Sequence, residues 1–406
     1  CRGCSYSDCL IFLLLFPGMK TLKTLHGKIT LPTFFPDGTK AVVKGVDSTD
    51  LVNAGVEGLV INTYHLLVNS LGEKMEKFGG VHNFMNWPNP VITDSGGFQV
   101  MSLVHDHPGM GKIDDNGITF KWDPSTSSTP LTTSSLRISG QKVVLTPEKS
   151  IELQLKLDTD IAIVLDDCVR PACAKASAGK PSTIDEKSVR RTIAWAKRSK
   201  KAFEKLINLR SQTRSGEAKT RPLLFAVVQG GNSKKLRKFC AEELIKIGFD
   251  GYCFGGFPVQ NGKFMTEMLE YTAKLLPPDK PKYALGVGKP EDIKKCVKMG
   301  YGIFDCVIPT REARHQKLYI IPSTPFGRSG QVNFENKFCS TLNIGSGRYA
   351  QSTEKISKIC DCLTCKTYSR AYLHHLFKIK DTLAIRLATI HNLRHYTRLM
   401  ESLKQS

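Results

Sequence analysis

The sequence alternates short apolar runs with amphipathic segments from about residue 40 to about residue 320. The apolar runs have the length of buried strands, and the segments between several of them repeat with helical periodicity. This alternation predicts βαβ units and an α/β fold, and seven or eight strands over roughly 280 residues fit a (β/α)₈ TIM barrel. The expected strands are 58–62, 90–93, 161–165, 223–228, 251–254, 283–286 and 302–307, and the expected helices are 188–208, 233–247, 264–276 and 290–299.

An open, doubly wound sheet is the alternative architecture. It is weakened because the chain has no Gly-x-Gly-x-x-Gly that follows a strand and opens a helix. Three polar stretches, 122–142, 170–187 and 210–221, are expected to be loops, and helical patterning returns over 368–403. We therefore expect a barrel domain over 19–335 and a smaller C-terminal subdomain over 336–406.

The net charge indicates the class of binding partner, and the cysteine content indicates the redox state of the compartment. Lysine and arginine outnumber aspartate and glutamate by 58 to 37, which gives a formal net charge of +21. A positive field of this size favours a polyanion such as a nucleic acid over a merely solvated basic surface. The 13 cysteines, without a secretory signal pattern, indicate a reducing compartment, which we take to be the cytoplasm.

The first residues differ from the rest of the chain. Residues 9–16 form an apolar run that is too short to span a bilayer and lacks the basic flank and cleavage site of a signal peptide. Coherent patterning begins at Met19, so we expect 1–18 to be a non-native or disordered leader. No membrane partner is expected.

Acidic or glycine-rich segments follow five of the expected strands, at 94–99, 166–168, 229–231, 255–256 and 286–288. In a parallel barrel these strand ends share one face, where active sites are built. Glycine and aspartate also mark ordinary turns, but five such segments on one face favour a site. Asp94, Asp166 and Gln229 could bind the polar edge of a flat heterocycle such as a purine, with Phe98 stacking on its face.

Asp305 lies inside an otherwise apolar strand. A buried carboxylate is costly there unless it has a partner or a task. An ionised aspartate, with an ordinary pKa of about 3.9, is already a nucleophile at neutral pH. It could attack an anomeric carbon, as glycosidase carboxylates do.

The C-terminal region contains Cys360-x-Cys362-x₂-Cys365, which places three thiols within six positions. With one imidazole this set fits a tetrahedral structural Zn²⁺ site, and four unrelated core residues are the weaker interpretation. A closed site of this kind leaves no coordination position for catalysis. The rival fourth ligands are His374, His375 and His391.

From about residue 20 to the C-terminus, these segments resemble the motif set of the tRNA-guanine transglycosylases. The motifs are Asn62-Thr63-Tyr64-His65-Leu66, Asp94-Ser95-Gly96-Gly97-Phe98-Gln99, Gln229-Gly230-Gly231, Gly286-Val287-Gly288 and Phe304-Asp305-Cys306-Val307-x-Pro309-Thr310-Arg311. The resemblance implies a zinc-containing (β/α)₈ barrel that exchanges guanine at wobble position 34 of certain tRNAs for a 7-deazaguanine, in queuosine biosynthesis. It also implies ping-pong kinetics and a homodimer, and the tRNAs for Asp, Asn, His and Tyr, with GUN anticodons, as substrates.

The resemblance assigns roles by position. Asp305 matches the nucleophile that attacks ribose C1′, Asp94 matches the general acid/base, and His391 matches the fourth zinc ligand. Phe98 and Leu285 match the residues on the two faces of the base. The implied base pocket is Ser95, Gly96, Gly97, Phe98, Asp166, Gln229, Gly256 and Leu285. The implied tRNA contacts are Gly286, Val287, Gly288, Lys289, Pro290, Glu291, Asp292, Thr310, Arg311, Glu312, Ala313 and Arg314.

The incoming base is the point at which the chain departs from the family pattern. The bacterial branch uses 7-aminomethyl-7-deazaguanine (preQ1) and the eukaryotic branch uses queuine. Cys168 and Val259 look bacterial, because a bulky residue at Val259 leaves less room for the cyclopentenediol of queuine. We therefore expect preQ1, although Pro258 has no N–H to donate and Asn261 stands in place of a carboxylate.

Two other functions compete with base exchange. One is a non-catalytic RNA-binding subunit of a queuine-inserting enzyme, and the presence of both Asp94 and Asp305 speaks against it. The other is a carbohydrate glycosidase, which the zinc ligands and the net charge disfavour. With Arg311 and Arg314, the cations of the C-terminal helices could form a phosphate-binding track. These cations are Arg370, Lys378, Lys380, Arg386, Arg394 and Arg398.

Overall fold

The structure is a computed structural model that describes residues 21–64, 71–106, 108–122, 141–168, 183–213, 221–320 and 340–405. The expected leader at 1–18 lies outside the described residues, as do most of the three expected loops and the expected domain boundary at 335/336. His65 and Leu66 of the first motif are also outside them.

Eight strands form the central sheet, and every neighbouring pair is parallel. Their order is β3 (Thr33–Pro36), β15 (Ile303–Cys306), β14 (Lys282–Ala284), β11 (Gly251–Phe254), β10 (Leu223–Val228), β9 (Ile161–Ile163), β5 (Val91–Asp94) and β4 (Leu59–Asn62). The two edges meet where Asp37 bridges Val60 and the Gly38 N–H donates to the Val60 carbonyl at 2.7 Å. The sheet is thus a nearly closed barrel, which confirms the expected fold and rules against the open sheet.

The seven expected strands each coincide with a strand of the barrel, within one or two residues at most ends. They were visible because strands buried on both faces read as continuous apolar runs. The first barrel strand, β3, was not expected. It has only four residues, and prolines at Pro32 and Pro36 make the segment read as a turn.

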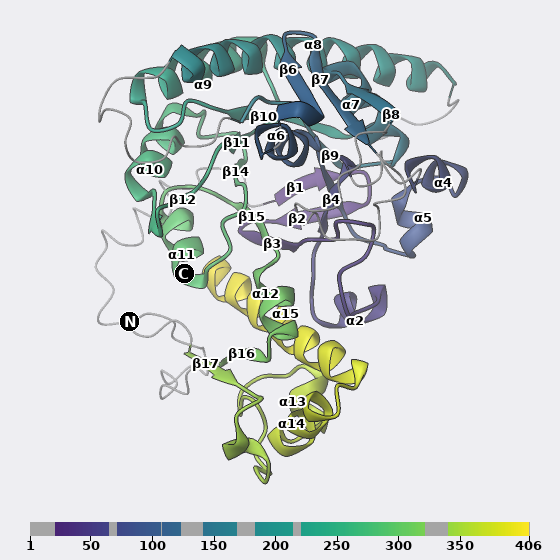
Figure 1. The fold of residues 1–406 in the computed structure, drawn as a ribbon, viewed down its shortest axis with the longest axis vertical. Coiled ribbons are helices and arrows are strands. Elements are labelled where there is room, and N and C mark those ends of the chain that lie inside the picture. The colour runs from purple at the N-terminus through teal and green to yellow at the C-terminus, as the bar shows by residue number, and fades with distance from the viewer. Residues whose placement is uncertain are drawn as a thin grey trace.

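Helices cover the outside of the barrel (Figure 1). They are α2 (Ser48–Asn53), α4 (Leu71–Lys77), α5 (Val81–Met85), α6 (Gly97–Asp106), α7 (Pro147–Lys156), α8 (Thr183–Thr213), α9 (Lys234–Ile247), α10 (Thr266–Leu275), α11 (Pro290–Lys298) and α12 (Ile308–Arg314). The four expected helices correspond to α8–α11. The helix α8 extends further than expected at both ends, into residues predicted to be loops.

Three smaller antiparallel sheets lie outside the barrel sheet in this part of the described chain. A hairpin of β1 (Thr21–Thr24) and β2 (Gly27–Thr30) precedes it, and a second pairs β12 (Val259–Gln260) with β13 (Lys263–Phe264). A three-stranded sheet of β6 (Gly111–Asp114), β7 (Gly117–Trp122) and β8 (Gln141–Leu145) lies between α6 and α7 in the chain. Only a loop over 122–142 was predicted in this region, so the sheet was not expected.

The C-terminal segment projects from one side of the barrel (Figure 1). It contains β16 (Lys317–Ile320), β17 (Ser340–Asn343), η3 (Gly347–Tyr349), α13 (Leu363–Thr367), α14 (Arg370–Lys378) and α15 (Thr382–Gln405). The last helix runs back to the barrel and contacts β3, α11 and α12. One apolar cluster contains both barrel residues such as Leu51 and Leu59 and C-terminal residues such as Leu373 and Leu387. Among the described residues, no helix is long and apolar enough to cross a membrane.

Candidate active site and metal centre

Asp94 is the last residue of β5 and is held by the neighbouring strand. The side chain of Asn62 on β4 donates to its Oδ2 at 3.0 Å, and the N–H of Gly96 reaches Oδ1 at 3.3 Å. Gly96 has φ +78, and a Cβ there would lie 2.7 Å from the Tyr64 nitrogen, so only glycine allows this turn. Burial raises the pKa of Asp94, and the negative charge of Asp37 raises it further.

Asp305 lies on β15, paired in register with Phe35 of β3. The Gly286 N–H, in the loop after β14, donates to its Oδ1 at 2.8 Å. Burial raises the pKa of Asp305 to about 6, with the charges of Asp94 and Asp37 adding to the effect and the Gly286 bond opposing it. The carboxyl is therefore mostly ionised at neutral pH, although it is a weaker acid than the sequence suggested.

Asp166 follows β9 and faces Gln229 at the end of β10. The Gln229 side chain donates to Asp166 Oδ2 at 2.6 Å, and both residues are buried. Burial raises the pKa of Asp166 to about 7, with a further contribution from Asp94. The structure thus brings the three predicted aspartates to one face of the barrel, where the charge of Asp94 raises the pKa of both Asp166 and Asp305.

Asp37 belongs to the same group of carboxyls and was missed by the sequence reasoning. It follows β3, which was itself not expected, and it receives the Thr39 hydroxyl at 2.5 Å. Burial raises its pKa, while Lys44 and Arg314 oppose the shift. Four carboxyls close enough to raise one another's pKa are a costly arrangement, which is typical of functional sites.

Arg237 on α9 was also missed, and it holds the far side of the pocket together. Its guanidinium donates to the carbonyls of Val228 at 2.7 Å, Gly231 at 3.0 Å and Gly255 at 2.9 Å. The side chain is only 1% exposed, and its guanidinium carbon lies 4.1 Å from the centre of the Phe254 ring. These bonds join the loop after β10, which carries Gln229, to the loop after β11, which carries Gly256.

The remaining predicted pocket residues lie around these groups. Ser95 is buried, and Gly97 begins α6, where a Cβ would lie 2.7 Å from the Leu165 side chain. Phe98 is 41% exposed at the pocket mouth, and its ring centre lies 5.4 Å from that of Phe257. Leu285 is half-buried after β14. An exposed aromatic ring beside a polar cavity is suited to stacking on a ligand.

The segment in which the chain departs from the family pattern forms the β12–β13 hairpin. Asn261 and Gly262 make its two-residue turn, with φ +49 and +76. Such turns favour Asn-Gly, which gives a local reason for asparagine at this position. Gln260 accepts a bond from the Asn232 side chain at 2.9 Å, and the Pro258 carbonyl accepts the Met265 N–H at 2.9 Å.

The two segments predicted to contact tRNA are only partly accessible. Gly286, Lys289, Glu291 and Arg311 are exposed, and Glu312 and Arg314 are half-buried. The others have buried side chains: Val287, Gly288, Pro290, Asp292, Thr310 and Ala313.

Several cations of the C-terminal helices are engaged within the protein. Arg386 forms a two-bond ion pair with Asp50 at 2.7 Å, and Arg394 pairs with Asp361 at 2.7 Å and with Glu401 at 2.6 Å. Arg370 pairs with Glu354, and Arg398 donates to the Ile359 carbonyl. Lys378 and Lys380 are exposed.

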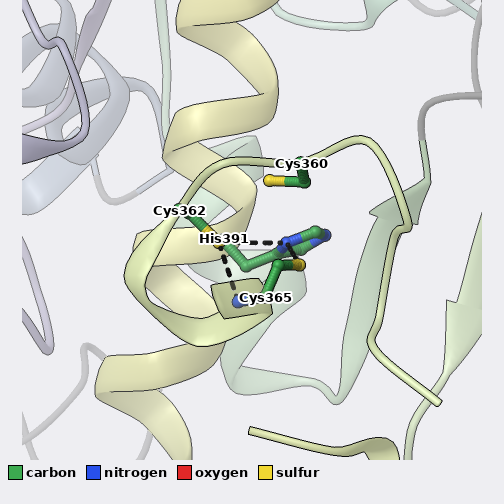
Figure 2. A group of neighbouring side chains, drawn as sticks. All are labelled: Cys360, Cys362, Cys365 and His391. Atoms are coloured by element: carbon green, nitrogen blue, oxygen red, sulfur yellow. Dashed lines mark hydrogen bonds between the residues drawn. The ribbon is translucent and has the colours of Figure 1, made fainter. Parts of the chain in front are cut away.

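Three thiols and one imidazole converge at the C-terminal end of the fold, as predicted (Figure 2). Their possible ligand atoms all lie within 4.8 Å of one another, and all four residues are buried: Cys360, Cys362, Cys365 and His391. His391 projects from α15, and its Nδ1 lies 3.2 Å from the Cys365 sulfur. The set could hold a metal ion.

The hydrogen bonds of the histidines decide between the rival ligands. Nε2 of His391 donates to the Tyr319 carbonyl at 2.6 Å, which leaves Nδ1 free of a proton for a metal. His374 instead bonds the Ile344 carbonyl at 2.7 Å, and His375 is exposed. The choice of His391 is therefore confirmed, and sulfur-rich tetrahedral donor sets of this kind suit zinc.

A second group of possible ligands lies at the opposite end of the barrel. Asp160 precedes β9 and faces His26 and His82, at 3.2 Å from each. The two imidazole rings stack with their centres 3.5 Å apart and only 21° between their planes. Lone pairs in nearly parallel planes do not converge on one ion, so this group is an ion-pair cluster.

The fold and the site together define a barrel enzyme with acidic groups gathered at one face of the barrel and a separate cluster of possible metal ligands. A family described as "Queuine tRNA-ribosyltransferase" matches residues 19–406. The "Queuine tRNA-ribosyltransferase" of Actinobacillus pleuropneumoniae serotype 3 is 40% identical over 381 residues, which cover 93% of this chain and 85% of the relative. Proteins of the same name from Actinobacillus succinogenes and Caldanaerobacter subterraneus are each 39% identical, over 96% and 95% of this chain and 89% and 88% of their own lengths. The chain belongs to the queuine tRNA-ribosyltransferase family of tRNA-guanine transglycosylases.

Proposed function

We propose that the protein replaces guanine at position 34 of tRNAs with GUN anticodons by a 7-deazaguanine, in two displacement steps at ribose C1′. The tRNAs for Asp, Asn, His and Tyr are the proposed substrates. The observation that carries the proposal is the group of carboxyls at the ends of β5, β9 and β15, with Asp166 buried and Asp94 and Asp305 half-buried, in a chain of this family.

Asp305 is the proposed nucleophile. Its ionised oxygen attacks C1′, the bond from C1′ to N9 of guanine breaks, and Asp94 supplies a proton to the departing base. The incoming base then gives a proton to Asp94 and attacks C1′, which releases the Asp305 carboxylate and restores the original configuration. With a pKa of about 6, roughly nine in ten Asp305 groups are ionised at pH 7.

The base is proposed to bind between the two loops tied by Arg237. Asp166, Gln229 and the backbone at Gly256 would bond its polar edge, and Phe98 and Leu285 would lie against its faces. The Asp166–Gln229 bond supports this role, because it orients both groups toward the same cavity before a ligand arrives. Ser95, Gly96 and Gly97 would line the side next to Asp94.

The test is exchange of radiolabelled guanine into a tRNA with G at position 34. We expect Asp305→Asn to lower kcat by about 10³-fold or more while tRNA affinity changes little. The matched control is Asp279→Asn, which alters an exposed aspartate outside the site. Equal incorporation by wild type and Asp305→Asn would refute the nucleophile.

A covalent adduct separates catalysis from the second function, a non-catalytic RNA-binding subunit. With a slowly reacting base analogue, wild type should retain tRNA on a denaturing gel and Asp305→Asn should not. A protein that binds the tRNA but forms no adduct and exchanges no guanine would favour the binding subunit.

We infer that the incoming base is preQ1. The bulk of Val259 in the β12–β13 hairpin supports a small substituent on the base. Competition among preQ1, queuine and guanine for labelled guanine release tests this directly. If queuine releases labelled guanine at a lower concentration than preQ1 does, the inference is contradicted. In that case Asn261→Glu should leave the order of preference between the two bases unchanged.

The metal proposed for Cys360, Cys362, Cys365 and His391 is Zn²⁺, one per chain, with a structural role. The proposal includes a homodimer in the cytoplasm, with the barrel over 19–335 and the zinc-binding subdomain over 336–406. The tRNA would lie along the exposed parts of the two predicted segments, above all Lys289 and Arg311. The metal content of the purified protein tests the zinc proposal, and its sedimentation tests the homodimer.

A further inference from the structure

The helix α15 runs from beside α13 back to α12 and the barrel (Figure 1). Asn392, next to the ligand His391, accepts the Tyr319 N–H at 3.1 Å. It donates to the carbonyls of Pro309 and Lys317, both at 3.0 Å. The helix is therefore bonded to the first turn of α12 and to β16, the strand that follows it.

Tyr396 stands about one turn further along the helix. Its hydroxyl donates to the Gly288 carbonyl at 2.7 Å. The ring is fully buried, with its centre 4.6 Å from that of Phe34 and 5.5 Å from that of Tyr319. These contacts fix the position of the hydroxyl.

Gly288 belongs to the short loop that holds Asp305. In this loop the Gly286 N–H donates to Asp305 Oδ1 at 2.8 Å, with Gly286 at φ +71. A Cβ at Gly288 would lie 1.8 Å from the sulfur of Cys306, the residue after Asp305. The loop is thus wedged between Tyr396 on one side and β15 on the other. Two glycines in three residues give its backbone little stiffness of its own.

We infer that Tyr396 is a positioning residue for Asp305, because its hydroxyl fixes the Gly288 carbonyl and thereby keeps the Gly286 N–H aimed at the carboxylate. The inference rests on the proposed role of Asp305 as nucleophile. A bond from an N–H favours the ionised carboxylate. Loss of that bond would raise the pKa of Asp305 and leave fewer molecules with an ionised nucleophile. The other groups that act on Asp305 are the carboxylates of Asp94 and Asp37, which raise its pKa, and the Tyr283 hydroxyl, which lowers it, and the variant replaces none of them.

Tyr396→Phe tests the inference, and Tyr301→Phe is the matched control. Both tyrosines are fully buried in the same apolar cluster, and each hydroxyl donates to a backbone carbonyl. Tyr301 bonds Leu269 at 3.0 Å, on α10 and away from the loop. Each variant therefore loses a bond from a buried hydroxyl to a backbone carbonyl, and only Tyr396→Phe touches the support of Asp305. Tyr396→Phe also loses a long contact with the Tyr319 hydroxyl, at 3.5 Å.

The readout is kcat for guanine exchange from about pH 5 to about pH 8.5. In this range kcat falls toward acid pH as Asp305 becomes protonated, and we call this part of the profile the acid limb. We expect the acid limb of Tyr396→Phe to lie about one pH unit higher than that of wild type. This shift lowers kcat about fivefold near pH 6 and changes it little near pH 8.5. Tyr301→Phe should keep the wild-type limb. Both variants should show a similar loss of a few degrees in Tm and an unchanged KM for tRNA.

The ratio of kcat at the two pH values does not depend on the fraction of active protein, so partial misfolding cannot imitate the shift. Superimposed limbs for wild type and Tyr396→Phe would overturn the inference, as would equal shifts in the two variants. A wild type without exchange activity would instead refute the proposed function, and the inference with it.

Discussion

Replacing Arg237 by methionine tests how the proposed base-binding site is assembled. The guanidinium bonds three carbonyls in the loops after β10 and β11, and it has no carboxylate at ion-pair distance in the described part of the chain. Methionine fills a similar volume but has no donor. The two loops should then separate, and Gln229 and the backbone at Gly256 should lose their relative placement.

The effects on stability largely offset. Three buried carbonyls without a donor cost about 1–3 kcal/mol each. Removing a buried, unpaired guanidinium recovers several kcal/mol of desolvation. We therefore expect the free energy of unfolding to fall by only about 1–4 kcal/mol. Base binding has no such compensation, and a displacement of about 1 Å costs up to about 100-fold.

The assay is equilibrium binding of guanine to the folded variant, with chemical denaturation measured in parallel. We expect a loss of affinity of about 10- to 100-fold for Arg237→Met. Arg237→Lys keeps the charge, but a single ammonium cannot span three carbonyls, so it should resemble methionine. Wild-type affinity in a folded Arg237→Met would refute the reasoning, and wild-type affinity in Arg237→Lys alone would show that charge matters more than geometry.

Two further predictions concern stability. Hydrogen bonds to Asp158 and Asp160 raise the pKa of His26 from 6.5 to about 9, so this stabilisation is complete below about pH 6.5 and is lost as the pH rises through about 9. Tm measured from pH 6.5 to 10 should fall more steeply for wild type than for His26→Gln, and equal slopes would contradict this. Chelation of the bound metal should lower Tm and tRNA affinity, because the binding energy of structural zinc, about 10 kcal/mol or more in small zinc peptides, is folding energy. Metal-free protein with unchanged Tm and tRNA affinity, by thermal melting and filter binding, would show that the cluster does not brace the fold.

The barrel could be predicted from the sequence because burial on both faces makes its strands plainly apolar. The three-stranded sheet of β6–β8 could not. Its first strand, β6, reads Gly-Lys-Ile-Asp and is half-buried or exposed throughout, so it carries neither an apolar run nor a clean alternation. The strand β3 was hidden by its flanking prolines in the same way.

Asp94, Asp166 and Asp305 were predictable because each follows or interrupts an apolar run, whereas Asp37 follows β3 and was missed with that strand. Arg237 gave no such signal. It lies on the buried stripe of α9 with Leu236 and Cys240, where a long cationic side chain ordinarily reaches out to solvent. Only the three-dimensional structure shows that three backbone carbonyls lie within its reach.

The structure also indicates a different role for the C-terminal helix from the phosphate binding that its charges suggested. Arg386 and Arg394, predicted for a phosphate track, are paired with Asp50, Asp361 and Glu401, and a paired cation must exchange partners before it binds phosphate. Uncharged side chains of the helix instead bond Pro309 in the first turn of α12, which follows the strand of Asp305, and Gly288 in the loop after β14. A metal ion held by His391 of this helix and the three cysteines would therefore stabilise more than the C-terminal segment. With Asp305 as the proposed nucleophile, metal loss should shift the pH dependence of kcat in the same direction as Tyr396→Phe.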